Sequence, residues 1–407
     1  MANPQTTVRS LPTRVDRYPA KMISHLAYKL VDRYAIGASH VLDPFCGSGA
    51  VLCAASSRKI RVTGVDVNPF GVLLSRVKVE GFDSTRSFRL LNELFQIMEK
   101  IDPIPVDWKN KTYWYTTATL KKLEKIRGAA MALNLGDSKS GRAILLAIGL
   151  SARLCSRADQ RSPKPFISKS AKSKRMGKHF DPTIIIESLL FELAQLHGGR
   201  RDTKAEVLER DIGNCESISG LEKNCSHVIT SPPYINAQDY FRNSKLELYL
   251  LEGLLPFCVD DVRRRFIGSE RSLDRACLDG SGADERREFV SELHRLEKIR
   301  PDLAVIVHTY FSKMQNALEL TKRAMMPNGT LVIVCGDNLI GGMRIVTWRI
   351  LNAMIEALGF TKFDCFEDEI RNRALAPTRR GHKGLIKQEV VSAFTLNEIR
   401  KKSKSSH

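Results

Sequence analysis

The sequence lacks the cysteine patterns of metal-binding and disulfide-rich proteins. Its nine cysteines are scattered, and none of them forms a Cys-x-x-Cys pair of the kind found in zinc sites. A chain of 407 residues, 43% of them apolar, can bury a sizeable core without disulfides. We therefore expect no metal site, and we expect most of the cysteines to be small buried apolar side chains.

Long apolar runs are also missing. The first 20 residues contain no apolar segment of the kind that a secretory signal has. No apolar run approaches the ~20 residues that a membrane-spanning helix needs. These absences predict a protein with no membrane partner, in a reduced cytoplasmic setting.

Acidic residues are fewer than basic residues. The chain has 64 Lys and Arg residues against 45 Asp and Glu residues, which gives a formal net charge of +19. Such a surplus favours a polyanionic partner, because each phosphate that is neutralised releases counterions. The charge therefore indicates a nucleic acid partner, although a merely soluble basic protein would share it.

A strand–helix–strand pattern marks the start of an α/β domain. The apolar segment at 40–45 ends in a turn, a helix begins at 50, and the strand-like segment at 61–66 precedes Pro69, which is typical of a first helical turn. This alternation predicts a mostly parallel sheet. Further strand-like segments lie at 205–211, 226–234, 330–338 and 389–396.

Two helical stretches interrupt the α/β pattern. The first is rich in Leu and Lys, and between Arg153 and Lys178 it has nine basic residues and one acidic residue, Asp159. The second has a dense charge cluster at 260–265. The predicted units are an N-terminal arm at 1–20, a core domain at 21–80 and 201–398, a basic helical insert at 81–200, a second helical insert at 237–300, and a basic tail at 399–407.

The segment DPFCGSGA (43–50) is a predicted strand-to-helix turn. Gly47 and Gly49 lack Cβ atoms, so a ligand can approach the backbone closely and the turn can use positive φ angles. Asp43 ends the strand, where open α/β sheets bind ligands. The third glycine of the dinucleotide fingerprint and the GK[ST] of a phosphate loop are absent. The turn is therefore a candidate cofactor site, although G-x-G alone is also common in structural turns.

Two further carboxylates follow predicted strands. Asp66 ends the second strand and can accept hydrogen bonds from both hydroxyls of a ribose. It could instead cap the helix that begins at Pro69, a role for which Asn68 competes, and we favour the ribose role. Asp211 is a candidate contact to an adenine amino group, with an ordinary loop carboxylate as the alternative.

The segment Ser231-Pro232-Pro233-Tyr234 reads as a rigid loop that ends in an aromatic ring. Its prolines fix φ and remove two donors, which leaves carbonyl oxygens and the Ser231 hydroxyl as acceptors. Hydrogen bonds from an exocyclic amine to Ser231 Oγ and the Pro232 carbonyl would direct the nitrogen lone pair toward an electrophilic methyl group. Tyr234 would stack on the base, which must be flipped out of a duplex. A proline-rich turn with a surface tyrosine is the alternative.

Three motifs, DPFCGSG, GVDVNP (64–69) and TSPPY (230–234), resemble those of the amino-group DNA methyltransferases of restriction–modification systems, which use S-adenosylmethionine. This resemblance implies a class I (Rossmann-like) methyltransferase fold, with a mostly parallel twisted sheet flanked by helices and with two largely helical insertions. The implied cofactor contacts are Tyr18, Pro19, Asp43, Phe45, Gly47, Gly49, Asp66 and Asp211. The implied catalytic residues are Ser231, Pro232, Pro233 and Tyr234.

The residue type at position 231 bears on the target base. Ser in this place is typical of the cytosine-N4 enzymes of the family, whereas adenine-N6 enzymes more often have Asp or Asn. The resemblance thus favours methyl transfer to N4 of a flipped-out cytosine in duplex DNA, by a modification enzyme that works beside a cognate restriction endonuclease. Adenine-N6 methylation is the close alternative. RNA guanine-N2 methylation and a non-catalytic nucleic-acid-binding subunit are weaker alternatives.

Both helical inserts are candidates for the target-recognition region. The segment 236–251 resembles a subset of DNA methylases in which Asp239, Arg242 and Lys245 face the substrate, although these residues could equally form a solvated helix face. The basic run that contains KSAKSKR (169–175) could equally be a disordered tether. The candidate DNA-contacting residues are Arg153, Arg157, Lys164, Lys172, Lys174, Arg175, Arg242 and Lys245.

Overall fold

A computed structural model of the protein describes most of the chain. The described residues are 14, 15, 18, 22–162, 164–170, 172, 180–200, 204–218, 220–235, 240–267, 287–369 and 388–397. Pro19, Lys174, Arg175 and Asp239, which the sequence marks as candidate site residues, lie outside them.

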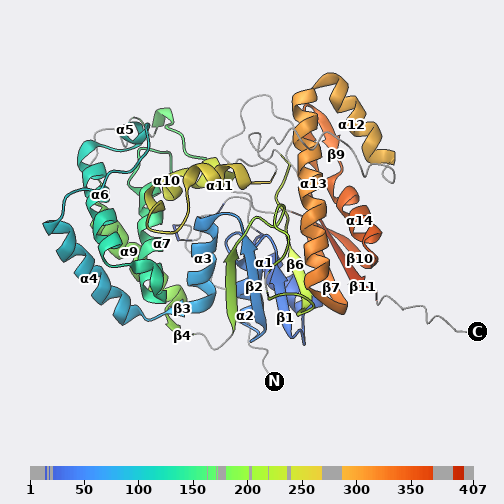
Figure 1. The fold of residues 1–407 in the computed structure, drawn as a ribbon, viewed down its shortest axis with the longest axis horizontal. Helices are drawn as coiled ribbons and strands as arrows, with labels where there is room; N and C mark the ends of the chain where they lie inside the picture. Colours follow the sequence, from blue (N-terminus) through green and yellow to red (C-terminus); the bar gives the residue numbers. More distant parts are fainter. Residues whose placement is uncertain are drawn as a thin grey trace, which may run out of the picture.

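A seven-stranded sheet forms the centre of the described part of the chain (Figure 1). Five neighbouring strands run parallel, in the order β5-β2-β1-β6-β7, and β11 and β10 add an antiparallel edge beside β7. This arrangement confirms the predicted class I (Rossmann-like) fold. The strands are β1 (His40–Asp43), β2 (Arg61–Asp66), β5 (Ala205–Glu209), β6 (Cys225–Thr230), β7 (Met325–Cys335), β10 (Phe360–Glu369) and β11 (Gln388–Leu396).

Both faces of the sheet are buried under helices, as expected of parallel strands with apolar side chains on both sides. In β1, for example, Val41 and Leu42 belong to separate apolar clusters on the two faces. The cluster of Val41 includes side chains of α1 (Ser24–Tyr34) and α2 (Ala50–Ser56). The cluster of Leu42 includes side chains of α13 (Pro301–Ala324) and α14 (Thr347–Ala357).

Helix α3 (Pro69–Glu80) follows β2 and has clear sequence signals at its start. Pro69 is its first residue, and the Asn68 side chain caps it by accepting a hydrogen bond from the Phe70 N–H at 3.1 Å. Asn68, and not Asp66, is therefore the N-cap of α3. Asp66 is left for another role.

Most of the remaining described helices form a second, all-helical mass beside the sheet, which we call the helical body (Figure 1, left). The part of it at 83–198 leaves and returns through a two-residue antiparallel pairing of β3 (Gly81–Phe82) with β4 (Gly199–Arg200), and its last two helices follow β6. The division of the chain into domains stays a prediction. The helical body comprises α4 (Ser84–Lys100), α5 (Lys111–Trp114), α6 (Thr117–Ala132), the 3-10 turn η1 (Leu135–Asp137), α7 (Lys139–Leu154), α9 (Pro182–His197), α10 (Tyr240–Leu251) and α11 (Val259–Arg265).

The two predicted inserts are thus joined in space. Helices α10 and α11 come from the second insert but bury their apolar side chains in the same cluster as α4, α6, α7 and α9. A Cβ atom at Gly149 of α7 would lie 2.9 Å from Leu251 Cδ1, so the glycine lets α7 and α10 pack closely. Helix α12 (Arg287–Ile299) packs instead with α13, above the sheet. The second insert is therefore divided between two parts of the fold.

Candidate active site

A pocket opens where four neighbouring parallel strands end. Asp43 ends β1, Asp66 ends β2, Asp211 follows β5 and Ser231 follows β6, and all four line this pocket. The pocket encloses about 780 Å³ including its open mouth, which is the size range of small-molecule sites. Its other lining residues are Tyr18, Met22, Pro44, Phe45, Cys46, Gly47, Ser48, Ala50, Val51, Val67, Arg210, Ile212, Pro233, Tyr240, Phe266 and Ile267.

The glycine turn after β1 is held by helix α3. Gly47 and Gly49 have φ angles of 49° and 75°, in the left-handed region that favours glycine. The Ser75 hydroxyl donates to the Gly47 carbonyl at 2.8 Å, and the Lys78 ammonium donates to the Ser48 carbonyl at 2.6 Å. Because these carbonyls are bonded from the side of α3, the turn is held in place with its open backbone at Gly47 facing the pocket.

Only one of the two glycines meets the pocket. Gly47 lines it, and a Cβ atom there would lie 2.9 Å from the ring of Tyr18, which packs over the turn from the N-terminal arm. Gly49 is not among the lining residues, and a Cβ atom there would lie 2.8 Å from Ser75 Oγ. The structure thus gives Gly49 a packing role against α3 and does not bring it to the predicted cofactor site.

Asp66 is fixed by the turn that it faces. One carboxylate oxygen accepts from the Gly47 N–H at 2.7 Å and the other accepts from the Asn68 N–H at 2.8 Å. Each carboxylate oxygen has two acceptor sites, so two further donors can be accommodated. The geometry is compatible with the predicted pair of ribose hydroxyls.

Asp211 lies at the far end of the same edge. Its oxygens accept from the Gly213 N–H at 3.1 Å and from the Asn214 side-chain amide at 2.8 Å. Beside it, Ile212 and Ile267 add apolar surface to the pocket wall. A flat ring with an amino group would find both an acceptor and an apolar surface here.

A hydrogen bond joins the two principal motifs. The Thr230 hydroxyl, at the end of β6, donates to an Asp43 oxygen at 2.7 Å. Strands β1 and β6 are neighbours, with Leu42 opposite Val228. The loop that begins at Ser231 is therefore positioned beside the glycine turn, although the two motifs are far apart in the sequence.

Ser231 and Pro233 line the pocket, whereas Tyr234 does not. The Tyr234 side chain is only 8% exposed, and its hydroxyl donates to the carboxylate of Glu389 on β11. The Tyr234 N–H donates to the Tyr240 hydroxyl at 3.2 Å. In this conformation Tyr234 braces the loop from behind, so the predicted stacking on a base would require its ring to move.

Burial changes the acidity of the two central carboxyl groups. Burial is the main cause that raises the pKa of Asp43 to about 7 and the pKa of Asp66 to about 6. The charge of Asp66 adds to the rise at Asp43, and the charge of Glu209 adds to the rise at Asp66. The hydrogen bonds from Thr230 and from the backbone oppose this rise without cancelling it. A cation in the pocket would favour the ionised forms of both groups.

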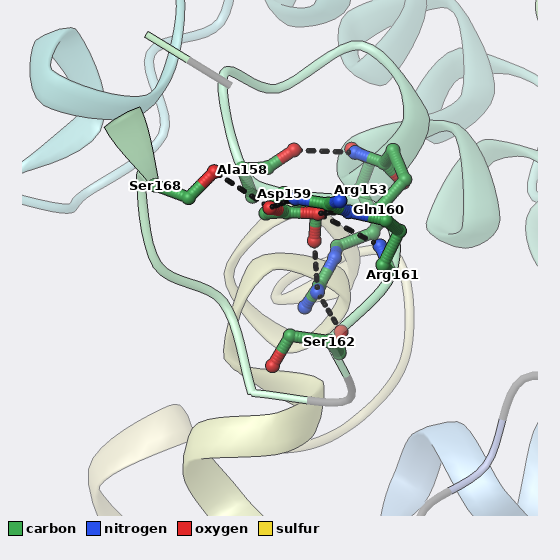
Figure 2. Close-up of polar contacts among 7 residues, drawn as sticks. All are labelled: Arg153, Ala158, Asp159, Gln160, Arg161, Ser162 and Ser168. Atoms are coloured by element: carbon green, nitrogen blue, oxygen red, sulfur yellow. Dashed lines mark hydrogen bonds and ion pairs between the residues drawn. The ribbon is translucent and has the colours of Figure 1, made fainter. Parts of the chain in front are cut away.

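One predicted DNA contact is wrong. The Arg153 side chain is only 2% exposed, and its guanidinium donates to the carbonyls of Asp159 and Ser162, which it holds from inside the loop (Figure 2). Arg153 ends the almost wholly buried run of helix α7. This continuous apolar run is the sequence signal that should have marked Arg153 as an interior residue.

The other described basic candidates lie closer to the surface. Arg157 is half-buried and donates to the carbonyls of Thr112 and Tyr113. Lys164 is half-buried, and Lys172 and Arg242 are exposed. Lys245 is half-buried, with its ammonium 4.4 Å from the centre of the Trp114 ring.

Sequence reasoning missed several residues of the pocket wall. Tyr240 and Phe266 both line the pocket, and their rings are nearly parallel with centroids 6.3 Å apart. Both come from the segment predicted as a second insert. Their position depends on how α10 and α11 return to the sheet edge, and no local motif announces it.

Known proteins resemble this chain only in part. No known protein-family model matches it. It is similar to the Type II methyltransferase M.MvaI of Kocuria varians, with 26% identity over 136 residues that make up 30% of this chain and 30% of that protein. It is also similar to the Type II methyltransferase M.MjaII of Methanocaldococcus jannaschii, with 28% identity over 95 residues, 23% of this chain and 15% of that protein. The matched part thus spans less than a third of either relative.

Two solved structures can be aligned over most of the chain. One is a TehB-like SAM-dependent methyltransferase from Corynebacterium glutamicum, with a TM-score of 0.30, 11% identity and coverage of 91% of this chain and 87% of that chain. The other is the rRNA methyltransferase aviRa from Streptomyces viridochromogenes, with a TM-score of 0.29, 13% identity and coverage of 95% and 90%.

The described residues lack two kinds of feature. No cluster of three or more His, Cys, Asp or Glu side chains suited to a metal ion occurs in that part of the chain. None of its helices is both long and apolar enough to cross a membrane.

Proposed function

We propose that the protein is an S-adenosylmethionine-dependent DNA methyltransferase that acts on the exocyclic amine of a flipped-out base, with cytosine N4 as the favoured target. The observation that carries this proposal is the Thr230–Asp43 hydrogen bond, which seats the SPPY loop beside a carboxylate-lined pocket. Partial similarity to two Type II methyltransferases supports it.

The pocket suits the proposed cofactor. Asp66 retains acceptor sites for the ribose hydroxyls, Asp211 offers an acceptor near apolar surface for the adenine, and Tyr18 and Phe45 add aromatic walls. The cofactor supplies a methyl group on a positively charged sulfur. The carboxylates of Asp43 and Asp66 would stabilise that charge at close range, because the surroundings are largely shielded from water.

The SPPY loop would orient the amine. Ser231 Oγ and the Pro232 carbonyl would each accept one N–H of the target amine, so that its lone pair points at the methyl carbon. The new N–C bond would form as the C–S bond breaks, the sulfur would leave neutral, and the methylated nitrogen would lose one proton. Positioning and local charge would lower the barrier without a covalent enzyme intermediate.

The choice of base rests on Ser231 alone. Ser in this place is typical of the cytosine-N4 enzymes that the motif resembles, but an adenine amine has the same two hydrogens and its N–H could donate to the same hydroxyl. Adenine N6 is therefore the second candidate. We also propose duplex DNA as the substrate, a cognate restriction endonuclease as the functional partner, and a cytoplasmic setting.

One experiment tests the function as a whole. The protein is expressed in a host that lacks DNA methylation, and the host DNA is sequenced for modified bases and their context. N4-methylcytosine at one recurring sequence is the expected result. N6-methyladenine would select the second candidate, and unmodified DNA from a strain with soluble, cofactor-binding protein would refute a DNA methyltransferase.

A further inference from the structure

The basic loop that follows α7 is an ordered structure along its described residues. Asp159 accepts hydrogen bonds from Arg161 and, at 2.6 Å, from Ser168 (Figure 2). Its backbone N–H donates to the Phe166 carbonyl at 2.9 Å. The Arg161 guanidinium lowers the pKa of Asp159 well below its ordinary range. These bonds join residues 159, 161, 166 and 168, whereas most of the KSAKSKR run (169–175), for which a disordered tether is the alternative, lies outside the described residues.

This internal bonding removes acidic charge from the surface of the loop. Asp159 is the single acidic residue between 153 and 178, and its side chain is only 6% exposed. Lys169 and Lys172 are exposed and Lys164 is half-buried. Among the described residues no carboxylate pairs with these three lysines. The outer side of the loop is thus purely basic.

Aromatic side chains lie beside these charges. The Arg157 backbone N–H donates to the Trp114 carbonyl at 2.8 Å, and its guanidinium donates to the Thr112 carbonyl at 2.8 Å, so the loop is fastened to α5. Tyr113 of α5 is 56% exposed and Phe166 of the loop is 41% exposed. Basic side chains interleaved with exposed aromatic rings form the surface that a nucleic acid strand prefers.

Helix α10 connects this surface to the pocket. Tyr240, its first residue, lines the pocket, and Lys245 lies over the Trp114 ring. Five residues of helix span ~7.5 Å at ~1.5 Å per residue. Figure 1 shows α5, α10 and α11 along the same side of the molecule. A strand that delivers a base to the pocket would therefore reach α5 and the loop within a few nucleotides.

We infer that α5 and the loop 155–172 form the DNA-contacting surface of the protein, on which the duplex next to the flipped-out base is held. Lys164, Lys169 and Lys172 contact phosphates, and Tyr113 and Phe166 pack against the sugars and bases exposed where the duplex opens. This inference rests on the proposed function. It assigns DNA contact to the first insert, with α10 of the second insert as the link to the pocket.

The test compares two triple charge reversals in the full-length protein. The loop variant carries Lys164→Glu, Lys169→Glu and Lys172→Glu. The control carries Lys59→Glu, Lys204→Glu and Lys223→Glu, three exposed lysines that precede β2, β5 and β6 at the opposite edge of the sheet. Both variants lose the same net charge, so a difference between them reports position rather than overall charge.

Binding to a fluorescein-labelled random-sequence DNA duplex is measured against salt, and S-adenosylmethionine binding is measured by calorimetry. The loop variant should bind DNA at least about tenfold more weakly, with a salt slope reduced by about 2.7, or ~0.9 for each of three phosphate contacts. Its cofactor affinity should equal that of the wild type. Equal losses in both variants, or no loss in the loop variant, would overturn the inference.

A second pair of variants tests the rings without changing charge. Tyr113→Ala and Phe166→Ala should weaken DNA binding severalfold at an unchanged salt slope, and unchanged affinity in both would contradict their part in the surface. If the wild type methylates DNA and the loop variant binds DNA as tightly as the wild type, only this inference fails. If the wild type binds the cofactor but prefers an RNA duplex, the proposed DNA substrate and this inference fail together.

Discussion

The pocket and the basic loop of the helical body treat a buried carboxylate in opposite ways. In the pocket, burial raises the pKa of Asp43 to about 7 and that of Asp66 to about 6. In the loop, the hydrogen bond from Arg161 lowers the pKa of Asp159. A carboxylate that is fully paired within the protein holds a structure together. A carboxylate left without a cationic partner in a pocket is poised for a ligand, and perturbed groups of this kind concentrate at functional sites.

The largest expected effect lies in the pocket, at the catalytic loop. Ser231→Ala should lower kcat by about 10²-fold, since removing one aligned hydrogen-bonding group from a preorganised site costs roughly 10²–10³. Affinity for S-adenosylmethionine should stay unchanged in calorimetry. Ser231→Thr, which keeps the hydroxyl, serves as the control and should retain more activity than the alanine variant. An alanine variant with wild-type kcat would remove Ser231 from the mechanism.

The next effect separates cofactor binding from sheet structure. Asp66→Ala should weaken S-adenosylmethionine binding by roughly 10–100-fold, because hydrogen bonds to a charged group contribute ~1.5–3 kcal/mol. Glu209→Ala is the matched control, since Glu209 lies opposite Asp66 on β5 and does not line the pocket. Similar losses in both variants would mean that the strand ends, and not the Asp66 carboxylate, decide affinity.

In the helical body, the corresponding test concerns stability. Arg153→Met should lower the free energy of unfolding by about 2 kcal/mol, because it leaves two loop carbonyls without their donor. Cofactor affinity should not change, since Arg153 does not line the pocket. Lys169→Met, on the exposed side of the same loop, should leave the melting temperature unchanged. Chemical denaturation of both variants measures the difference, and equal stability would show that Arg153 is dispensable.

The smallest effect is a pH dependence with opposite signs in the free and bound protein. Both pocket carboxyl groups have folded pKa values above the ordinary 3.8, so the free protein should lose stability as pH rises from about 4 to about 7. Binding of a cationic cofactor favours the ionised groups, so its affinity should instead increase through pH 6–7, by at most about tenfold per unit for each proton released. Asp43→Asn should flatten the upper part of both curves. Calorimetry in buffers of different ionisation enthalpy would show the proton release, and its absence would contradict the coupling.

Most of the sheet and most of the pocket could be predicted because their signals are local. Pro69 and Asn68 mark the start of α3, and the glycines of the first turn require positive φ angles. Parallel strands bring their carboxyl ends to one edge. The residues that end or follow these strands therefore line one pocket, however the inserted helices are packed. They are Asp43, Asp66, Asp211 and Ser231.

The parts that were not predicted depend on distant contacts. The Tyr234 hydroxyl donates a hydrogen bond to Glu389, which lies 155 positions further along the chain, and the Tyr234 side chain does not line the pocket. The joining of the two inserts depends on the fit of Leu251 against Gly149. Both contacts join residues that are far apart in the sequence. The local pattern of residues therefore does not predict either contact.

The hydrogen bond between Thr230 and Asp43 spans 187 positions of sequence. Of the chain between them, residues 83–198 leave the sheet and return to it through the narrow β3–β4 neck. Such a layout is modular in an evolutionary sense. A lineage could lengthen, trim or exchange the helices beyond the neck, and thereby alter the surface that we propose for DNA contact, while the pocket at the sheet edge stays unaltered.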